Sequence, residues 1–234
     1  MDPILAEGIQ RLCKAENVVD ALIKPRVEAV SDLLEKYIAE IELFNPAYGL
    51  VGAREHRELV TKHILDSLAP LHIILRLLEK QGTLHRNAVT PLSIADAGSG
   101  AGLPGIPLAI VLPDLSFILI ERMGRRAGFL RNTIAVLGLS NVTVEEGEME
   151  KQTPERFNII TFRAFRPLEE PLLKGLFRLL APGGVLAAYK GRMEAIQTEM
   201  EAAEKYTGKW EALPCPVPGL NEERHLLIIQ GKQQ

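Results

Sequence analysis

The sequence predicts an α/β protein with a doubly wound, mostly parallel sheet and an N-terminal helical region. Apolar residues recur at three- and four-residue steps over the first 85 residues. From about residue 90 onward, short apolar runs alternate with helical segments. A glycine-rich segment lies between the first of these runs and the helix that follows it. We therefore expect a helical region over residues 1–85 and a sheet domain over residues 86–234.

The composition is that of an ordinary globular protein. The chain has 234 residues, of which 47% are hydrophobic and 24% charged, and its formal net charge is −3. These values exclude a disordered chain and give no global sign of nucleic-acid binding. Cys13 and Cys215 lack the spacing of a disulfide framework or a zinc site. The apolar run over residues 106–120 is too short for a membrane span. We expect a cytoplasmic monomer that binds neither a membrane nor a metal ion.

Two long helical stretches are expected before the sheet. Between Pro25 and Asn45 the apolar residues form one stripe along a helix of several turns. The residue before a proline avoids helical backbone angles, so Asn45–Pro46 is expected to end this helix. A second stretch runs from about Arg54 to Lys80, with a break at Pro70.

The pattern of residues 86–234 predicts strands and helices in alternation. Buried parallel strands are short, rich in β-branched residues and bounded by turns. Strands are expected at residues 92–97, 116–121, 142–145, 158–162 and 185–189, with a last strand at the sheet edge over 226–230. Helices are expected between them at residues 106–112, 125–137, 168–180 and 193–205.

The glycine-rich segment from Asp96 to Gly105 indicates a ligand-binding loop. Glycines at Gly98, Gly100 and Gly102 would let the backbone turn tightly and approach a ligand closely. The loop can be interpreted in two ways. Residues 100–105 satisfy the dinucleotide pattern G-x-G-x-x-G, which would indicate an NAD(P)-dependent oxidoreductase. The acid at Asp96 favours instead a cationic ligand without phosphates, and S-adenosylmethionine is such a ligand.

Further cofactor contacts follow from the doubly wound fold. Glu121 ends the second expected strand, where an acid can accept hydrogen bonds from both ribose hydroxyls. Adenine should lie against the end of the third strand, for which Met149 and Glu150 are the candidates. His63 and Asp66 are one helical turn apart, and we interpret them as a hydrogen-bonded pair at the junction of the two parts.

A basic rim is expected beside this loop. Arginine recognises phosphate through its planar fork of donors, and aromatic rings stack on bases. The candidates for RNA contact are Arg122, Arg125, Arg126, Arg163, Phe165 and Lys190. No general base is evident, so we assign no catalytic residue.

The motifs together resemble the ribosomal RNA small-subunit methyltransferase G family, first called glucose-inhibited division protein B. The resemblance rests on residues 45–50, 62–67, 96–107, 124–131, 163–165, 190–191 and 223–226. It implies a class I, Rossmann-like fold and S-adenosylmethionine-dependent methylation of N7 of a guanine in small-subunit (16S) ribosomal RNA. It also implies ribosomal RNA or a ribosomal particle as partner. The implied cofactor contacts are Gly98, Leu103, Met149, Glu150 and Arg163.

The chemistry implied by this family suits a site without a general base. Guanine N7 carries an in-plane lone pair and needs no deprotonation before it attacks a methyl group. Catalysis then depends on aligning the nucleophile, the methyl carbon and sulfur. Two alternatives stay open at this point, the oxidoreductase and a non-catalytic RNA-binding assembly factor.

Overall fold

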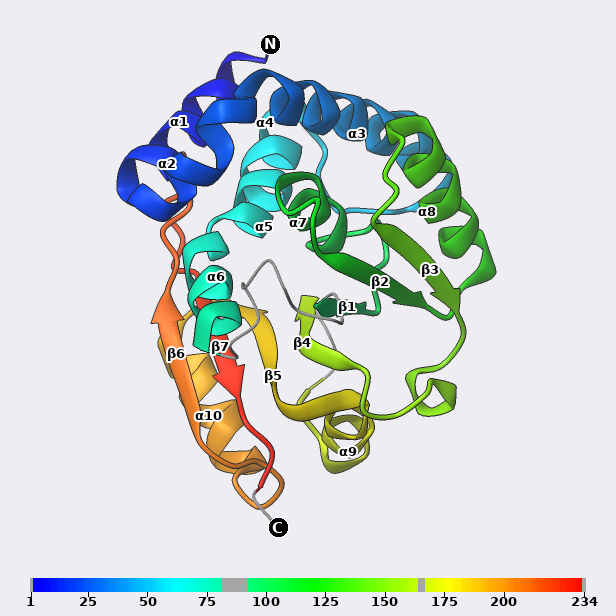
Figure 1. Ribbon diagram of the computed structural model, residues 1–234, viewed down its shortest axis with the longest axis vertical. Helices are drawn as coiled ribbons and strands as arrows, with labels where there is room; N and C mark the ends of the chain where they lie inside the picture. The colour runs from blue at the N-terminus through cyan, green and yellow to red at the C-terminus, as the bar shows by residue number, and fades with distance from the viewer. Residues whose placement is uncertain (1, 81–91, 164–166, 233–234) are drawn as a thin grey trace.

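A computed structural model describes residues 2–80, 92–163 and 167–232, and its described residues form one seven-stranded sheet (Figure 1). The order across the sheet is β3-β2-β1-β4-β5-β7-β6. Strands β1 to β5 run parallel, and β7 is antiparallel to both of its neighbours. Their bounds are β1 Ser93–Ala97, β2 Ser116–Glu121, β3 Val142–Glu146, β4 Phe157–Arg163, β5 Leu180–Lys190, β6 Trp210–Pro214 and β7 His225–Ile229. This confirms the predicted fold class.

The strands are apolar on both faces because helices cover both sides of the sheet. Side chains alternate between two buried clusters, as β2 shows: Phe117 and Leu119 face one side, Ile118 and Ile120 the other. The cluster on the first side also contains the buried residues of the N-terminal helices. That side is covered by α1 Pro3–Ala15, α2 Asn17–Ile23, α3 Val27–Tyr48, α4 His56–Leu59, α5 Asp66–Leu68, α6 Leu71–Lys80, α7 Gly105–Val111 and α8 Gly124–Leu137.

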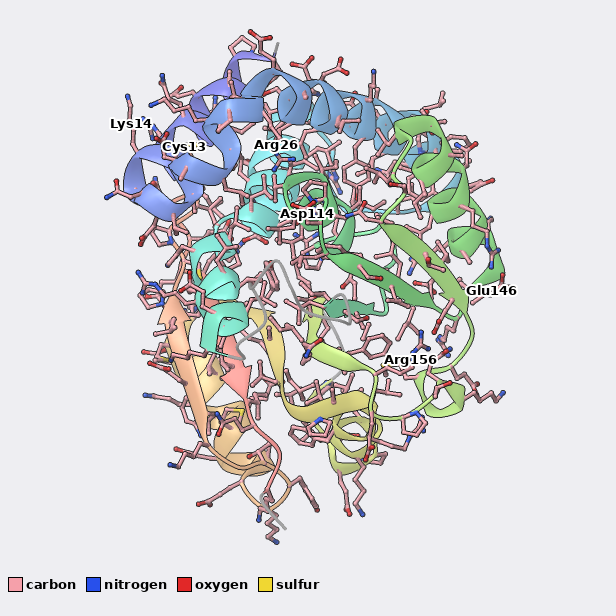
Figure 2. The ribbon with its side chains drawn as sticks, in the orientation of Figure 1. Cys13, Lys14, Arg26, Asp114, Glu146 and Arg156 are labelled. Atoms are coloured by element: carbon pink, nitrogen blue, oxygen red, sulfur yellow. The ribbon has the colours of Figure 1, made fainter. Side chains whose placement is uncertain are left out.

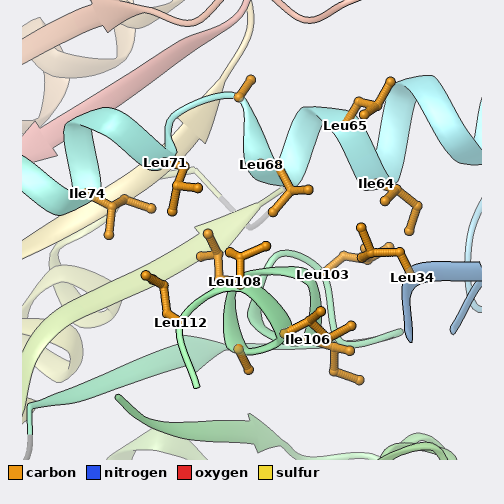
Figure 3. Close-up of a cluster of buried hydrophobic side chains, with 14 of the residues drawn as sticks. Leu34, Ile64, Leu65, Leu68, Leu71, Ile74, Leu103, Ile106, Leu108 and Leu112 are labelled. Atoms are coloured by element: carbon orange, nitrogen blue, oxygen red, sulfur yellow. The ribbon is translucent and has the colours of Figure 1, made fainter. Parts of the chain in front are cut away.

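The opposite side carries α9 (Glu170–Leu179) and α10 (Met193–Ala203). Figure 3 shows how α5 and α6 on the first side pack against α7, with Leu68 and Leu71 facing Leu108. The N-terminal helical region is therefore part of the main core, and α7 lies between it and the sheet. The expected boundary between residues 85 and 86 falls outside the described residues.

Two hydrogen bonds join the N-terminal helices to the loop and helix after β1. The hydroxyl of Tyr37 on α3 is fully buried and donates to the Ala101 carbonyl at 2.8 Å. Arg26, in the single turn η1 (Lys24–Arg26), lies above α7 in Figure 2 and donates to the Val111 carbonyl at 2.9 Å. A cation at a helix C-terminus satisfies free carbonyls and complements the helix dipole. Both ends of the segment from Ala101 to Val111 are thus held by the N-terminal region.

The predicted end of α3 is wrong. The helix continues through Asn45–Pro46 to Tyr48 and ends at Gly49, whose φ is 59°. The Gly49 amide donates to the Asn45 carbonyl, and the Asn45 side chain accepts from the Val51 amide, both at 2.9 Å. Because this left-handed cap completes the last turn, it outweighs the steric preference against a helical residue before proline.

The predicted place of the last strand is also wrong. Residues 226–230 were expected at the edge, but β7 lies inside the sheet between β5 and β6. The edge on this side is β6, which the sequence did not reveal. Its residues Trp210 to Pro214 are exposed or only half-buried, so they lack the apolar run that indicates a strand. The remaining expected strands and helices are confirmed, and the break at Pro70 separates α5 from α6.

Replacing Tyr37 by Phe should lower the free energy of unfolding by about 1–3 kcal/mol, because the buried Ala101 carbonyl would lose its donor. Urea titration followed by circular dichroism measures this change. Leu43→Ala, on the same helix at a residue that is 69% exposed, is the matched control and should change stability by less than about 0.5 kcal/mol. Equal effects of the two substitutions would contradict the role of this hydrogen bond.

Candidate active site

The candidate site lies where the strand order reverses. β1 pairs with both β2 and β4, so the loop after β1 lies at the carboxyl ends of three adjacent parallel strands. Ligands of doubly wound folds bind at this crevice. In the loop Gly98, Gly100 and Gly102 have φ of 68°, 58° and 93°, values that favour glycine. The amides of Gly98 and Ser99 donate to the Ile120 carbonyl, which ties the loop to β2.

The glycines of the loop serve two purposes. A Cβ on Gly102 would lie 2.5 Å from the Ile106 side chain, and one on Gly105 would lie 2.4 Å from the Leu119 side chain. These two glycines permit close packing of α7 on the sheet. Among the described residues, a Cβ on Gly100 would meet only the Gly98 carbonyl, at 3.9 Å, so this side of the loop is open toward them. The open side is where a ligand can approach the backbone.

Asp96 lies beneath the loop rather than on its open side. Its side chain is 1% exposed, and Oδ2 accepts from the Gly105 amide at 3.0 Å. Burial raises the pKa of this carboxyl to about 7, against the lowering effects of the Gly105 amide and Arg163. The predicted direct contact of Asp96 with a cationic ligand is therefore not supported by this geometry. The carboxyl instead accepts from the Gly105 amide at the start of α7. A pyrophosphate bound at a helix N-terminus would need this amide as a donor.

Glu121 ends β2, as expected, and is 4% exposed. Its Oε2 accepts from the Gly100 amide at 2.9 Å and its Oε1 from the Met123 amide at 2.8 Å. A carboxylate has about four acceptor positions, so the two amides leave capacity for further donors. Glu121 thus fixes Gly100 and keeps acceptor capacity at the end of the strand.

Two other predicted cofactor contacts, Met149 and Leu103, lie on opposite sides of the sheet. Met149 lies on the single turn η3 (Met149–Lys151), in the buried cluster that includes Ala97 and Ile120. The Gly147 amide, just before this turn, donates to the Glu121 carbonyl at 3.0 Å, so the segment that carries Met149 and Glu150 passes the end of β2. Leu103 packs instead on the N-terminal side, near Leu34 and Ile64 in Figure 3. Its side chain belongs to the core, so only its backbone borders the loop.

Two of the arginines expected at the RNA surface contact the end of α3. The Arg125 guanidinium lies 5.2 Å from the centre of the Tyr48 ring, and Arg126 donates to the Gly49 carbonyl at 3.4 Å. Arg122 is exposed beside them. Lys190, at the end of β5, forms an ion pair with Glu199 at 2.6 Å. Phe165 lies outside the described residues.

Arg163 connects the sheet to the N-terminal helices. It ends β4, and its guanidinium contacts an Asp66 oxygen and His63 Nδ1, each at 3.1 Å. The π-helical turn η2 (Val60–Leu65) presents His63, and Asp66 follows it directly. The second Asp66 oxygen accepts from Arg224 at 3.1 Å. His63 and Asp66 do lie at the junction, as predicted, but Arg163 is the partner that they share.

A cavity of about 350 Å³ opens beside this cluster, lined by Lys62, His63, Asp66, Pro70, Arg163, Tyr189, Lys190, Gly191, Cys215, Arg224 and His225. Burial and the neighbouring Arg163 lower the pKa of His63 to about 4. Sequence reasoning did not assign Arg224 and His225 to the site. They follow an irregular segment, and only their position at the start of β7 brings them to this edge of the sheet.

Neither a metal centre nor a transmembrane helix is found in the part of the chain that the structure describes. No group of three or more His, Cys, Asp or Glu side chains there could hold a metal ion. No helix of the described residues is long and apolar enough to cross a bilayer.

The sheet order and the loop after β1 define a class I, Rossmann-like fold, which methyltransferases of known structure share. Among solved structures, the tRNA (m1A58) methyltransferase of Aquifex aeolicus shares this fold, with a TM-score of 0.54 and 14% identity over 73% of this chain and 69% of that one. A SAM-dependent methyltransferase from Aquifex aeolicus has a TM-score of 0.50 and 18% identity over 70% and 91% of the two chains.

The particular family follows from closer relatives. The family model described as rRNA small subunit methyltransferase G matches residues 31–227. The ribosomal RNA small subunit methyltransferase G of Treponema denticola is 38% identical over 97% of this chain and 93% of the relative. The protein of the same name from Stenotrophomonas maltophilia is 38% identical over 87% and 88% of the two chains. The chain belongs to the rRNA small subunit methyltransferase G family.

Asp66→Asn should lower the free energy of unfolding by about 3 kcal/mol, because it leaves two partly buried guanidinium groups without their shared carboxylate. Chemical denaturation measures the loss. Asp114→Asn, at an exposed residue, provides the matched control and should have almost no effect. A loss no larger than that of the control would show that the Asp66 cluster does not hold the two parts together.

Asp96→Asn should change how stability depends on pH. In the unfolded chain Asp96 ionises near pH 4, whereas in the folded chain its pKa is about 7. The folded parent therefore binds more protons between these values and loses stability as the pH rises through them. The variant cannot ionise, so its stability relative to the parent should rise from pH 4 to 7 by up to about 4 kcal/mol and then level off. Urea midpoints across this range test it, and a constant difference would contradict it.

Proposed function

We propose that this protein transfers the methyl group of S-adenosylmethionine to N7 of a guanine in small-subunit ribosomal RNA. The observation that carries the choice of cofactor is the Asp96 carboxyl at the start of α7. It accepts from the Gly105 amide, so this amide at the helix N-terminus already has an acceptor and is not available to a pyrophosphate. The relatives named as ribosomal RNA methyltransferases support the choice of substrate.

The residues of the loop fit the cofactor. The open side at Gly100 would admit the ligand to the backbone, and the remaining acceptor capacity of Glu121 would bind the ribose hydroxyls. Met149 would supply an apolar contact for adenine, with Glu150 beside it on η3. S-adenosylmethionine, when bound, supplies an electrophilic methyl group on a sulfonium. Asp96 and Tyr37 would position this loop from behind rather than touch the cofactor.

The chain's own contribution to the chemistry is alignment. Guanine N7 is a nucleophile without prior proton removal, so the site needs to hold N7, the methyl carbon and sulfur in line. Arg163, Lys190 and the cavity beside them lie at the carboxyl ends of β4 and β5, next to the cofactor loop. The exposed Arg122, together with Arg125, is available for phosphate contacts along the RNA backbone.

The direct test is methyl transfer from labelled S-adenosylmethionine to small-subunit ribosomal RNA, offered both as naked RNA and as the subunit. The RNA should come from cells that lack the enzyme. Mass analysis of the digested product should then find 7-methylguanosine. Calorimetry with S-adenosylmethionine and with NAD distinguishes the oxidoreductase alternative. Absence of transfer to either form of the RNA, or binding of NAD alone, would overturn the proposal.

Glu121→Gln should weaken S-adenosylmethionine binding by about tenfold or more. The amide replaces one acceptor oxygen by a donor, so it opposes one of the two backbone amides and removes an acceptor from the ribose. Calorimetric titration measures the affinity. Glu146→Gln is the control. Glu146 is the residue of β3 that lies opposite Glu121 in the sheet, but its side chain is exposed and forms an ion pair with Arg131 instead of contacting the loop. Similar affinities of both variants would contradict the role of Glu121.

A further inference from the structure

The cavity beside Arg163 has cationic walls, but each lysine and arginine among the described residues that line it already has an anionic partner. Arg163 and Arg224 share Asp66, at 3.1 Å each. Arg224 also pairs with Glu222 at 2.8 Å. The two lysines are paired as well, Lys190 with Glu199 and Lys62 with both Glu58 and Glu222. Because these cations are already paired, the neutral groups of the wall are the ones left to select a ligand by hydrogen bonds.

His63 is one such neutral group, and its tautomer follows from its neighbour. The Arg163 guanidinium lies 3.1 Å from His63 Nδ1. Arginine only donates hydrogen bonds, so Nδ1 must accept and cannot carry a proton. The proton of the neutral ring is then on Nε2, and His63 faces the cavity as a donor. The lowered pKa of His63 agrees with a neutral ring.

His225 has the opposite arrangement. Its Nδ1 lies 2.7 Å from the Gly191 carbonyl, which can only accept a hydrogen bond. Nδ1 therefore carries the proton, and Nε2 of the neutral ring is an acceptor. Within residues 2–80, 92–163 and 167–232, neither histidine has a hydrogen-bond partner at Nε2. The cavity thus offers one donor, His63 Nε2, and one acceptor, His225 Nε2, and neither nitrogen has a partner among the described residues.

We propose that His63 and His225 select guanine as the base to be methylated. His63 Nε2 donates to guanine O6, and His225 Nε2 accepts from the adjacent N1–H. Adenine presents the reverse pattern, a donor at N6 and an acceptor at N1, and would oppose both histidines. This arrangement engages the Watson–Crick edge and leaves N7 free towards the loop after β1. A cavity of about 350 Å³ is within the range of pockets that hold molecules of this size.

The proposal rests on the proposed function, and base analogues at the methylated position test it. The target guanosine, once mapped, is replaced by ligation with 2-aminopurine riboside, which lacks both O6 and the N1 proton but keeps N7. The parent enzyme should methylate guanosine about tenfold faster than the analogue, since a site that hydrogen-bonds a group disfavours a substrate lacking it. His63→Asn keeps an acceptor for Arg163 in the place of Nδ1 but has no donor in the place of Nε2. It should lower the rate on guanosine and reduce this ratio, and the preference that remains is the part due to N1–H and His225.

His63→Gln is the matched control, because its amide nitrogen can take the place of Nε2–H. It should restore part of the preference for guanosine. Inosine lacks only the 2-amino group, and the parent should methylate it about as fast as guanosine. Retention of the full guanosine preference in His63→Asn would overturn the role of His63, whereas a parent enzyme inactive on all of these RNAs would overturn the proposed function itself.

The role of His225 is tested with the same kind of paired substitutions. His225→Asn keeps a donor for the Gly191 carbonyl and removes the acceptor, while His225→Gln places an oxygen near the position of Nε2. The first should lower kcat/KM on guanosine by about tenfold, and the second should recover part of the loss. Thermal denaturation of both variants checks that they are folded. Equal activity of His225→Asn and the parent would overturn the role of His225.

Discussion

The hydrogen bond from the Gly105 amide to the buried Asp96 carboxyl is the constraint on which the site depends. It fixes the start of α7 against the end of β1, so the glycines between them must reverse the chain within a few residues. It also satisfies an amide at the N-terminus of α7, which removes the feature that attracts phosphate in dinucleotide-binding folds. One buried acid therefore fixes the start of α7 and satisfies an amide that a phosphate would otherwise bind.

The N-terminal helices complete the site rather than merely cover the sheet. Tyr37 holds the loop from one side, and Asp66 binds arginines from the ends of two strands that are far apart in sequence. A buried carboxylate between two guanidinium groups costs desolvation energy, so it contributes more to position than to stability. Because Asp66 follows the turn that presents His63, any movement of this turn would displace a wall of the cavity and the Arg163 side chain together.

Much of the fold could be predicted because it depends on local patterns. Strands β1 to β5 are apolar runs between turns, and the loop at Gly98 to Gly102 has the glycines that its backbone angles require. The end of α3 and the edge strand β6 could not be predicted, because they depend on a helix cap and on pairing with distant residues. The same holds for the site. The position of Glu121 follows from the strand order, but the contacts of Arg125, Arg163 and Arg224 follow only from how the two parts pack.

The pairing of the described cavity cations with acids suits the proposed reaction. Transfer of a methyl group to N7 gives the base a positive charge, and an unpaired guanidinium beside the ring would raise the energy of that transition state. Asp66, Glu222 and Glu199 neutralise the arginines and the lysine nearest the cavity. The neutral ring of His63 can then bind the base through a hydrogen bond without opposing the developing charge. A site that used free arginines to bind O6 would hold guanine more tightly before the reaction and less tightly during it, which is the opposite of what catalysis requires.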